Sequence, residues 1–243
     1  MSDHPTPLGK LPAEAIGSLK LPALAPDLIA GFRTLPDLTG IVSDAMDALG
    51  IVGAVPASIL RPTDPAARIV GRALTVHNIA RAGSVSAAVA TGMSGLGEIE
   101  AHNLAQPGDV LVIQGIDHVS NLGGMSATIG HRQGEIGAVI DGGARDVDHS
   151  RAIGLPVWSR SVSPITGKWR VETVAVNKLV VICGIPVEPG DVVIADEVGV
   201  CFIPRERAAD VLERARRNAA AEAAREARIA AGVPVKELLP PRR

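Results

Sequence analysis

Residues 121–149, NLGGMSATIGHRQGEIGAVIDGGARDVDH, decide the fold of this 243-residue chain. Two glycines open a segment that predicts a helix over 123–133, and the apolar run 136–141 then predicts a buried strand. The pair Gly142-Gly143 predicts a loop, and residues 147–153 predict a short helix. This order of strand, loop and helix is typical of a parallel sheet layered with helices.

The neighbouring segments extend the same α/β pattern. Apolar runs rich in Val and Ile predict further strands at 68–79, 111–113 and 155–158. Helices are expected over 41–49, capped by Thr39 and stopped by Gly50, and over 84–93. The chain therefore supplies enough strands and helices for a layered α/β domain.

A second pattern begins after the last of these strands. The turn Pro-Gly-Asp-Val occurs at 107–110 and again at 189–192, and each copy leads into a β run. The segment 174–204 lacks the strand-helix alternation, so it predicts antiparallel strands in a second layer or small barrel.

Three regions are expected along the chain. Residues 1–35, rich in Pro, Leu and Ala, predict an arm with a short helix, and residues 36–204 form the main catalytic domain. Residues 205–243 predict a C-terminal amphipathic helix and a tail, because small and apolar side chains recur on one stripe.

Composition narrows the range of functions. Lys plus Arg (24) nearly balance Asp plus Glu (26), so the chain has no strong field for nucleic acid or anionic lipid. Aromatic residues make up 2% of the chain, too few for a base-stacking surface. No apolar run is long enough to span a membrane, and residues 1–4 do not resemble a signal peptide, so a cytoplasmic protein is expected. Cys183 and Cys201 lie in apolar runs and are expected to be free, buried side chains.

The glycine pair at 123–124 is the first candidate binding element. Glycines at the start of a helix leave backbone N–H groups accessible, and the helix dipole favours an anion there. We expect Gly123, Gly124 and Met125 to bind the carboxylate of a small substrate. A tight turn without a ligand would use the same glycines.

Arg145 and Asp146 are the candidate catalytic residues. They follow a buried strand, and ligands of α/β sheets gather beyond the carboxyl ends of strands. Arg145 offers a planar fork to a carboxylate, and Asp146 offers a hard oxygen to Mg²⁺ or Mn²⁺. A 2-oxo acid could chelate such a metal, and carbon–carbon cleavage would leave an enolate beside both charges. The alternative is a helix-capping Asp146 beside a solvated Arg145.

Several further polar residues are weaker candidates. His149 could hydrogen-bond metal-bound water or lie on a helix surface, and Lys168 could meet a second substrate carboxylate. Asp196 and Glu197 could reach the metal water of a neighbouring subunit or simply form a turn. A last set could line the mouth of the site, but a solvated face is the expected role, namely for Glu98, Glu100 and His102.

The sequence resembles the family of the regulator of ribonuclease activity A and the class II 4-hydroxy-4-methyl-2-oxoglutarate/4-carboxy-4-hydroxy-2-oxoadipate aldolases. The similarity runs from Thr39 to the C-terminal helix. The motifs that carry it are Ser43-Asp44-Ala45, 71–76 (GRALTV), 107–110, 139–142 (VIDG), Arg145-Asp146, Val176-Asn177, 189–196 (PGDVVIAD) and Gly199-Val200.

This resemblance implies an RraA-like α/β/β/α sandwich that assembles as a homotrimer or homohexamer with sites between subunits. It also implies a motif of an acid, twenty residues, Arg-Asp, two residues and a second acid. Arg145 and Asp146 match that motif. The first acid falls on Gly124 and the second on His149, so both acidic positions depart from the family pattern.

Three functions are compatible with these features. The first is a magnesium-dependent lyase (aldolase) that cleaves a 4-hydroxy-2-oxo acid to pyruvate or acts as an oxaloacetate decarboxylase. The second is a non-catalytic regulator that binds a ribonuclease or helicase, which the missing acid at Gly124 favours. The third is a lyase for a different oxo acid, its altered motif reflecting an altered substrate.

Overall fold

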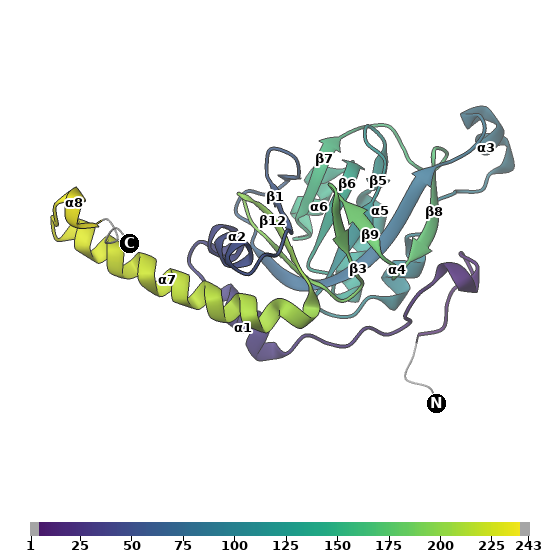
Figure 1. The fold of residues 1–243 in the computed structure, drawn as a ribbon. Helices are drawn as coiled ribbons and strands as arrows, with labels where there is room; N and C mark the ends of the chain where they lie inside the picture. The colour runs from purple at the N-terminus through teal and green to yellow at the C-terminus, as the bar shows by residue number, and fades with distance from the viewer. Residues whose placement is uncertain (1–4, 239–243) are drawn as a thin grey trace.

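The computed structural model describes residues 5–238 and shows a curved mixed sheet with helices on its two outer faces (Figure 1). Strand β3 (Ile69–Ala80) lies in the middle of this sheet. On one side it pairs in parallel with β4 (Asp109–Gln114), followed by β6 (Gly137–Ala144) and β7 (Val157–Val162). The predicted parallel core is therefore confirmed.

The other side of β3 carries the antiparallel strands. Strand β11 (Val192–Ala195) pairs antiparallel with β3, and β12 (Gly199–Ile203) and β1 (Ala54–Pro56) continue the order. The expected antiparallel strands thus exist, and they share hydrogen bonds with the parallel half instead of forming an isolated sheet.

Short strands complete the edges. Strand β8 (Val171–Val176) pairs with the far end of β3, and β9 (Val180–Ile182) and β10 (Ile185–Val187) form a separate hairpin. The remaining two strands are β2 (Arg61–Pro62), which pairs with β7, and β5 (Ser120–Leu122), which pairs with β6.

The two halves of the curved sheet pack against each other. Inward side chains of the parallel strands, including Val112, Val139 and Trp158, share one buried cluster with Val193 and Phe202 of the antiparallel strands. The alternate residues of the same strands face outward, as the two-residue period of a strand requires. This cluster forms the interior of the β/β layers.

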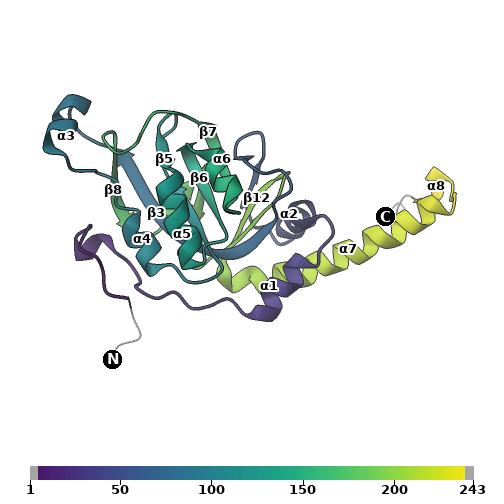
Figure 2. The same cartoon turned by 180° about the vertical axis from the view of Figure 1, so that it is seen from behind.

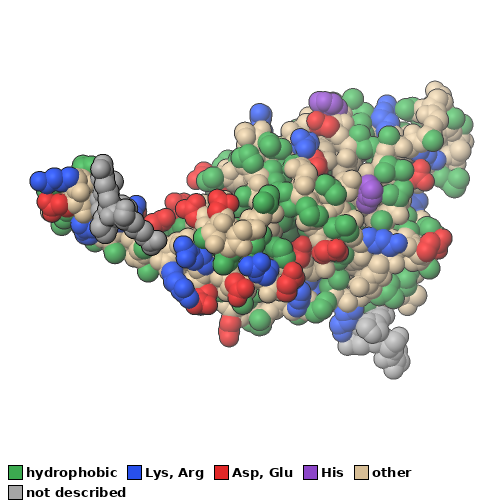
Figure 3. Space-filling model, in the orientation of Figure 1, with side chains coloured by type: hydrophobic (Ala, Val, Ile, Leu, Met, Phe, Trp, Pro, Cys, Tyr) green, Lys and Arg blue, Asp and Glu red, His purple; other side chains and the backbone are tan. Residues whose placement is uncertain are grey.

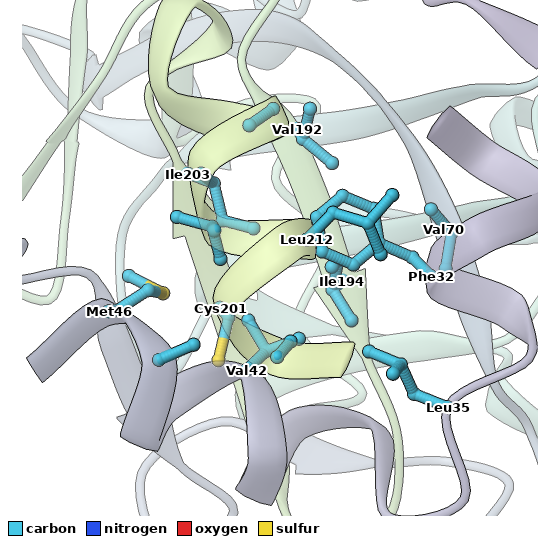
Figure 4. Close-up of a cluster of buried hydrophobic side chains, with 14 of the residues drawn as sticks. Phe32, Leu35, Val42, Met46, Val70, Val192, Ile194, Cys201, Ile203 and Leu212 are labelled. Atoms are coloured by element: carbon cyan, nitrogen blue, oxygen red, sulfur yellow. The ribbon is translucent and has the colours of Figure 1, made fainter. Parts of the chain in front are cut away.

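One outer layer covers the antiparallel half. It consists of α1 (Pro26–Arg33), α2 (Leu38–Ala48) and α7 (Ala208–Ala230). Phe32, Val42 and Leu212 from these helices pack on Ile194 and Ile203 (Figure 4). Only the first half of α7 takes part, since from residue 220 its side chains are exposed and the helix extends beyond the sheet (Figure 1).

The other outer layer covers the parallel half (Figure 2). It contains α4 (Ile99–Leu104), α5 (Gly124–Gln133) and α6 (Val147–Ala152), which enclose Leu111, Ile113 and Ile140 of the sheet. Together the layers give the expected α/β/β/α order. The helices α3 (Val85–Thr91) and α8 (Val235–Leu238) lie outside these layers (Figure 1).

Two local predictions need correction. Thr39 does not cap α2: Asp37 occupies that position, and Thr39 is buried inside the helix, where its hydroxyl and N–H both donate to Asp196 (2.6 and 3.0 Å). Gly142-Gly143 is not a loop but part of β6, where added side chains would collide with the backbone of Ile116 and Val119.

The described part of the N-terminal arm runs from residue 5 to α1. The arm carries a short 3₁₀ turn, Ala13–Ala15, before α1, and its Ile16 bridges to Val176. Residues 1–4 and the final residues of the predicted tail, 239–243, lie outside the described range. Within 5–238, no helix combines the length and apolar character that a membrane crossing requires.

The two cysteines are free, as expected. Cys201 is buried under α2, and Cys183 is partly buried in the β9–β10 turn. Burial raises the pKa of Cys201 to about 12 and that of Cys183 to about 11, so both thiols remain protonated and unreactive near neutral pH. Charged side chains of both signs are interspersed on the face seen in Figure 3, consistent with the balanced composition.

A buried ion pair joins the sheet to the arm. Arg72 of β3 donates to Asp109 of β4 at 2.8 and 3.0 Å, and its remaining nitrogen donates to the carbonyls of Leu21 and Pro22. Burial raises the pKa of Asp109, while the guanidinium of Arg72 opposes that shift. Removing Arg72 would therefore leave a carboxylate desolvated and without its main partner.

We expect Arg72→Leu to lower the free energy of unfolding by about 3–5 kcal/mol, because removing one member of a buried ion pair leaves the other charge buried without a partner. Urea denaturation followed by circular dichroism measures this. Arg61→Leu, at an exposed position of β2, is the matched control and should change stability by less than about 0.5 kcal/mol. Equal, small losses in both variants would contradict this role for Arg72.

Candidate functional site

Arg145 and Asp146 lie where β6 ends and α6 begins. The N–H of Arg145 still bonds to the carbonyl of Leu122 on β5 (3.1 Å), which fixes the strand exit. Asp146 then adopts a left-handed conformation, with φ of 55° and ψ of 38°, and turns the chain into the helix. Asp is one of the few residue types that tolerate this conformation.

The carboxylate of Asp146 reaches the start of α5. Its Oδ2 accepts a hydrogen bond from the N–H of Gly124 (2.8 Å) and lies 3.4 Å from Nε of Arg145. Its Oδ1 has no hydrogen-bond partner among residues 5–238. Gly124 is the first residue of the helix, so Asp146 satisfies one of the N–H groups that a helix start leaves free.

These residues line a pocket with a volume of about 420 Å³. The five residues predicted for catalysis and substrate binding all line it: Gly123, Gly124, Met125, Arg145 and Asp146. The structure therefore brings together segments that are about twenty residues apart. The roles that we predicted for them remain predictions.

Lys168 lines the same pocket, consistent with its expected place near a second substrate carboxylate. It is exposed, and its ammonium lies 4.4 Å from the centre of the Trp169 ring. A cation held over an aromatic face keeps its charge available to the pocket. Its role in binding is likewise a prediction.

His149 and Glu197 do not line this pocket. His149 is exposed on α6, and its Nε2 lies 2.8 Å from the hydroxyl of Thr128 on α5. Glu197 is exposed on the β11–β12 turn and does not line the pocket of its own chain. Its neighbour Asp196 has a structural part, since it holds Thr39 and the N–H of Val198. Contact of Glu197 with a neighbouring subunit remains a prediction.

The solvated face predicted for Glu98, Glu100 and His102 is wrong. Glu100 is fully buried and accepts from the N–H groups of Leu8 and Lys10 (2.9 and 2.6 Å), so it fastens the arm. His102 is 1% exposed. Glu98 is partly buried and lines the pocket. The apolar arm covers α4, and the helix sequence alone gave no sign of that cover.

His102 connects the pocket to the protein interior. Its Nε2 lies 2.7 Å from the hydroxyl of Ser126, which lines the pocket, and its Nδ1 lies 2.7 Å from Oε1 of buried Glu135. Ser126 escaped the sequence analysis because a serine in the first turn of a helix normally needs no special partner. Burial raises the pKa of Glu98, while a backbone hydrogen bond, His102 and Ser126 partly offset that rise.

The donor set fits a weakly chelated Mg²⁺ or Mn²⁺ ion. Across residues 5–238, no three His, Cys, Asp or Glu side chains gather into a metal cage. Magnesium does not need one, because it keeps several waters and takes one or two protein carboxylates. Asp146 meets that requirement, since one of its oxygens is anchored and the other is unpaired in a pocket.

The left-handed backbone at Asp146 leads to a stability prediction. Asp146→Asn should keep the fold within about 1 kcal/mol, because Asn tolerates this conformation and retains an acceptor for Gly124. Asp146→Val should be less stable than Asp146→Asn by at least about 1 kcal/mol, because a β-branched residue is strained there. Thermal unfolding of both variants tests this, and equal midpoints would argue against strain at the site.

The fold is that of an RraA-like α/β protein, and its pocket lies at the start of a helix. The RraA-like (Aldolase/RraA) family matches residues 39–202, and the chain belongs to this family. A provisionally named 4-hydroxy-4-methyl-2-oxoglutarate aldolase of Halalkalibacterium halodurans is 31% identical over 213 residues. That match covers 85% of this chain and 90% of the relative.

Solved structures agree with this placement. An uncharacterized protein from Pseudomonas syringae pv. tomato superposes with a TM-score of 0.73 at 27% identity, covering 89% of this chain and 98% of that one. RraAS2 of Streptomyces coelicolor, described as an unusual member of the RNase ES inhibitor RraA family, gives 0.65 at 25% identity, covering 80% and 92%. The expected fold class is thus confirmed.

Proposed function

We propose that this protein is a divalent-metal-dependent carbon–carbon lyase. It cleaves a 4-hydroxy-2-oxo acid to pyruvate, decarboxylates oxaloacetate, or does both. The observation that carries the proposal is the carboxylate of Asp146, anchored by Gly124 beside Arg145 in a pocket at a strand exit. The aldolase name of the H. halodurans relative supports the same reaction class.

The chain's own residues supply binding and charge stabilisation. Arg145 pairs with the substrate carboxylate through its guanidinium, and the N–H groups of the first turn of α5, at Met125 and Ser126, lack helix carbonyl partners and add donors for an oxyanion. Asp146 would hold Mg²⁺ or Mn²⁺, which supplies a Lewis acid for the oxygen of the enolate. Lys168 lies on the pocket wall, where a second carboxylate of a diacid would find a cation.

A second candidate is a regulator that binds a ribonuclease or helicase without catalysis. The description of the S. coelicolor relative as belonging to a family of RNase inhibitors favours it, and so does the glycine at 124 where the lyase motif has an acid. Such a regulator needs neither metal nor oxo acid. Binding of both ligands in the pocket therefore separates the two functions.

We also propose assembly into a homotrimer or homohexamer. Met125 is 77% exposed beside the pocket, and Val198, next to Glu197, is 58% exposed. Apolar side chains at these places would be covered by a neighbouring subunit. Glu197 of that subunit could then approach the metal waters at Asp146.

The lyase proposal predicts pyruvate formation from oxaloacetate with Mg²⁺. Asp146→Asn should lower kcat/KM at least about 100-fold, because the metal ligand loses its charge while the turn is kept. Asp148→Asn, exposed on the same helix, is the matched control and should retain activity. If the wild type forms pyruvate no faster than Asp146→Asn, the lyase proposal fails.

Titration calorimetry discriminates the regulator. With Mg²⁺ and oxalate, an enolate mimic, the wild type should bind both ligands. Oxalate binding should depend on the metal, because oxalate chelates the bound metal ion. Asp146→Asn should abolish that dependence. If the wild type binds neither Mg²⁺ nor oxalate, the regulator function is favoured.

A further inference from the structure

A chain of four polar side chains leads from the pocket into the interior. Glu98 and Ser126 both line the pocket, and the Ser126 hydroxyl acts to lower the pKa of the Glu98 carboxyl. The hydroxyl of Ser126 meets Nε2 of His102 at 2.7 Å, and Nδ1 of His102 meets Glu135 at 2.7 Å. His102 and Glu135 come from α4 and from the turn after α5, so tertiary packing creates the chain.

The inner part of this chain is costly as a purely structural feature. The side chains of His102 and Glu135 are 1% and 0% exposed, and the second oxygen of Glu135, Oε2, is buried without a partner among the described residues. Burying ionisable groups is unfavourable unless they are fully paired. A buried polar group without a partner calls for an explanation, such as strain, a catalytic role, or a bound water or ion.

The chain can hold one proton at either of two places. In one arrangement Glu98 is protonated and donates to Ser126, which donates to neutral His102, which donates through Nδ1 to ionised Glu135. In the other, the proton has passed through Ser126, so Glu98 is a carboxylate and His102 is an imidazolium beside Glu135. Ser126 already meets His102, so passage of the proton requires only that the carboxyl of Glu98 comes within hydrogen-bonding distance of the Ser126 hydroxyl.

The pocket offers few other groups for proton transfer. The family motif places an acid at position 124, where this chain has glycine, and an added Cβ there would lie 3.2 Å from His149. Oδ2 of Asp146 is held by Gly124 and Arg145, and its Oδ1 is the proposed ligand of the metal ion. Arg145 and Lys168 are the cations of the pocket lining, and neither is a proton acceptor at neutral pH.

We propose that Glu98 is the general acid–base residue of the pocket, held in place and supplied with a proton site by Ser126, His102 and Glu135. This inference rests on the proposed lyase function. Glu98 contacts the substrate, and the other three are positioning residues. The environment agrees, since burial raises the pKa of Glu98, the direction that favours a carboxyl group as an acid–base catalyst.

The proton and electron count of the cleavage is balanced by Glu98 alone. Ionised Glu98 takes the proton of the C4 hydroxyl, the O–H pair becomes the new C4 carbonyl bond, and the C3–C4 pair leaves to form the enolate of pyruvate. Glu98 then returns the same proton to C3, which becomes the methyl group. Decarboxylation of oxaloacetate differs because CO₂ departs without removal of a hydroxyl proton, and the enolate that remains takes its C3 proton from water when Glu98 does not supply it.

This difference gives a test that separates Glu98 from the rest of the site. Glu98→Gln keeps the shape but cannot take or give a proton. Three rates are measured with Mg²⁺: cleavage of 4-hydroxy-4-methyl-2-oxoglutarate, exchange of the pyruvate methyl protons in D₂O by NMR, and decarboxylation of oxaloacetate. We expect the first two to fall at least about 100-fold in Glu98→Gln and the third to stay within about threefold.

Two further variants test the chain behind Glu98. Ser126→Ala and His102→Asn should slow cleavage and methyl exchange about tenfold or more, with smaller effects on decarboxylation, because they interrupt the proton site. Glu172→Gln, exposed on β8, is the matched control and should leave all three rates unchanged. Thermal unfolding of each variant verifies that the fold is retained.

The outcomes are distinct. If Glu98→Gln loses decarboxylation as strongly as methyl exchange, or loses neither, Glu98 is not the acid–base residue although the lyase stands. If the wild type catalyses none of the three reactions, both the lyase and this inference are overturned. A loss limited to the two proton-dependent reactions supports Glu98.

Discussion

The ion pair between Arg72 and Asp109 holds the structure at the junction of its two halves. Arg72 stands on β3 directly opposite Asp109 of the parallel neighbour β4 and Val192 of the antiparallel neighbour β11. The same guanidinium binds the arm at Leu21 and Pro22. One buried side chain thus contacts both halves and the arm, whose earlier residues Leu8 and Lys10 bind Glu100 of α4.

The repeated Pro-Gly-Asp-Val turn has a common geometry with two uses. In both copies the Asp carboxylate accepts from the N–H three residues earlier, at Gln106 and at Glu188, and the glycine before it has positive φ. Asp109 also meets Arg72, whereas Asp191 accepts from the N–H of Arg205 at the entry to α7. Each turn therefore precedes a strand that pairs with β3. Through its Asp, the first turn is connected by Arg72 to the arm, and the second is connected to the start of α7.

The sequence predicted the parts of the fold that depend on local patterns, and it missed those that depend on remote contacts. The strands, α5, α6 and the strand exit at Arg145-Asp146 follow from apolar periodicity and glycine placement. Thr39 was misplaced because a residue 157 positions away, Asp196, binds it. Burial of Glu100 and His102 depends on the arm and α5, and Ser126 became a site residue only because His102 lies beside it. Charged and polar residues on a short helix look solvated until the covering segment is known.

The two departures from the family motif are one structural change. An added Cβ at Gly124 would lie 3.2 Å from the His149 ring and 3.4 Å from Asp146, so a longer acidic side chain would compete for the space beside that imidazole. His149 instead contacts Thr128, whose hydroxyl donates to the carbonyl of Gly124 (2.8 Å). Among the described residues, the pocket lining carries two carboxylates, those of Asp146 and Glu98. In the proposed lyase, Asp146 and Arg145 serve charge stabilisation and Glu98 serves proton transfer, so the absence of acids at 124 and 149 does not by itself argue against catalysis.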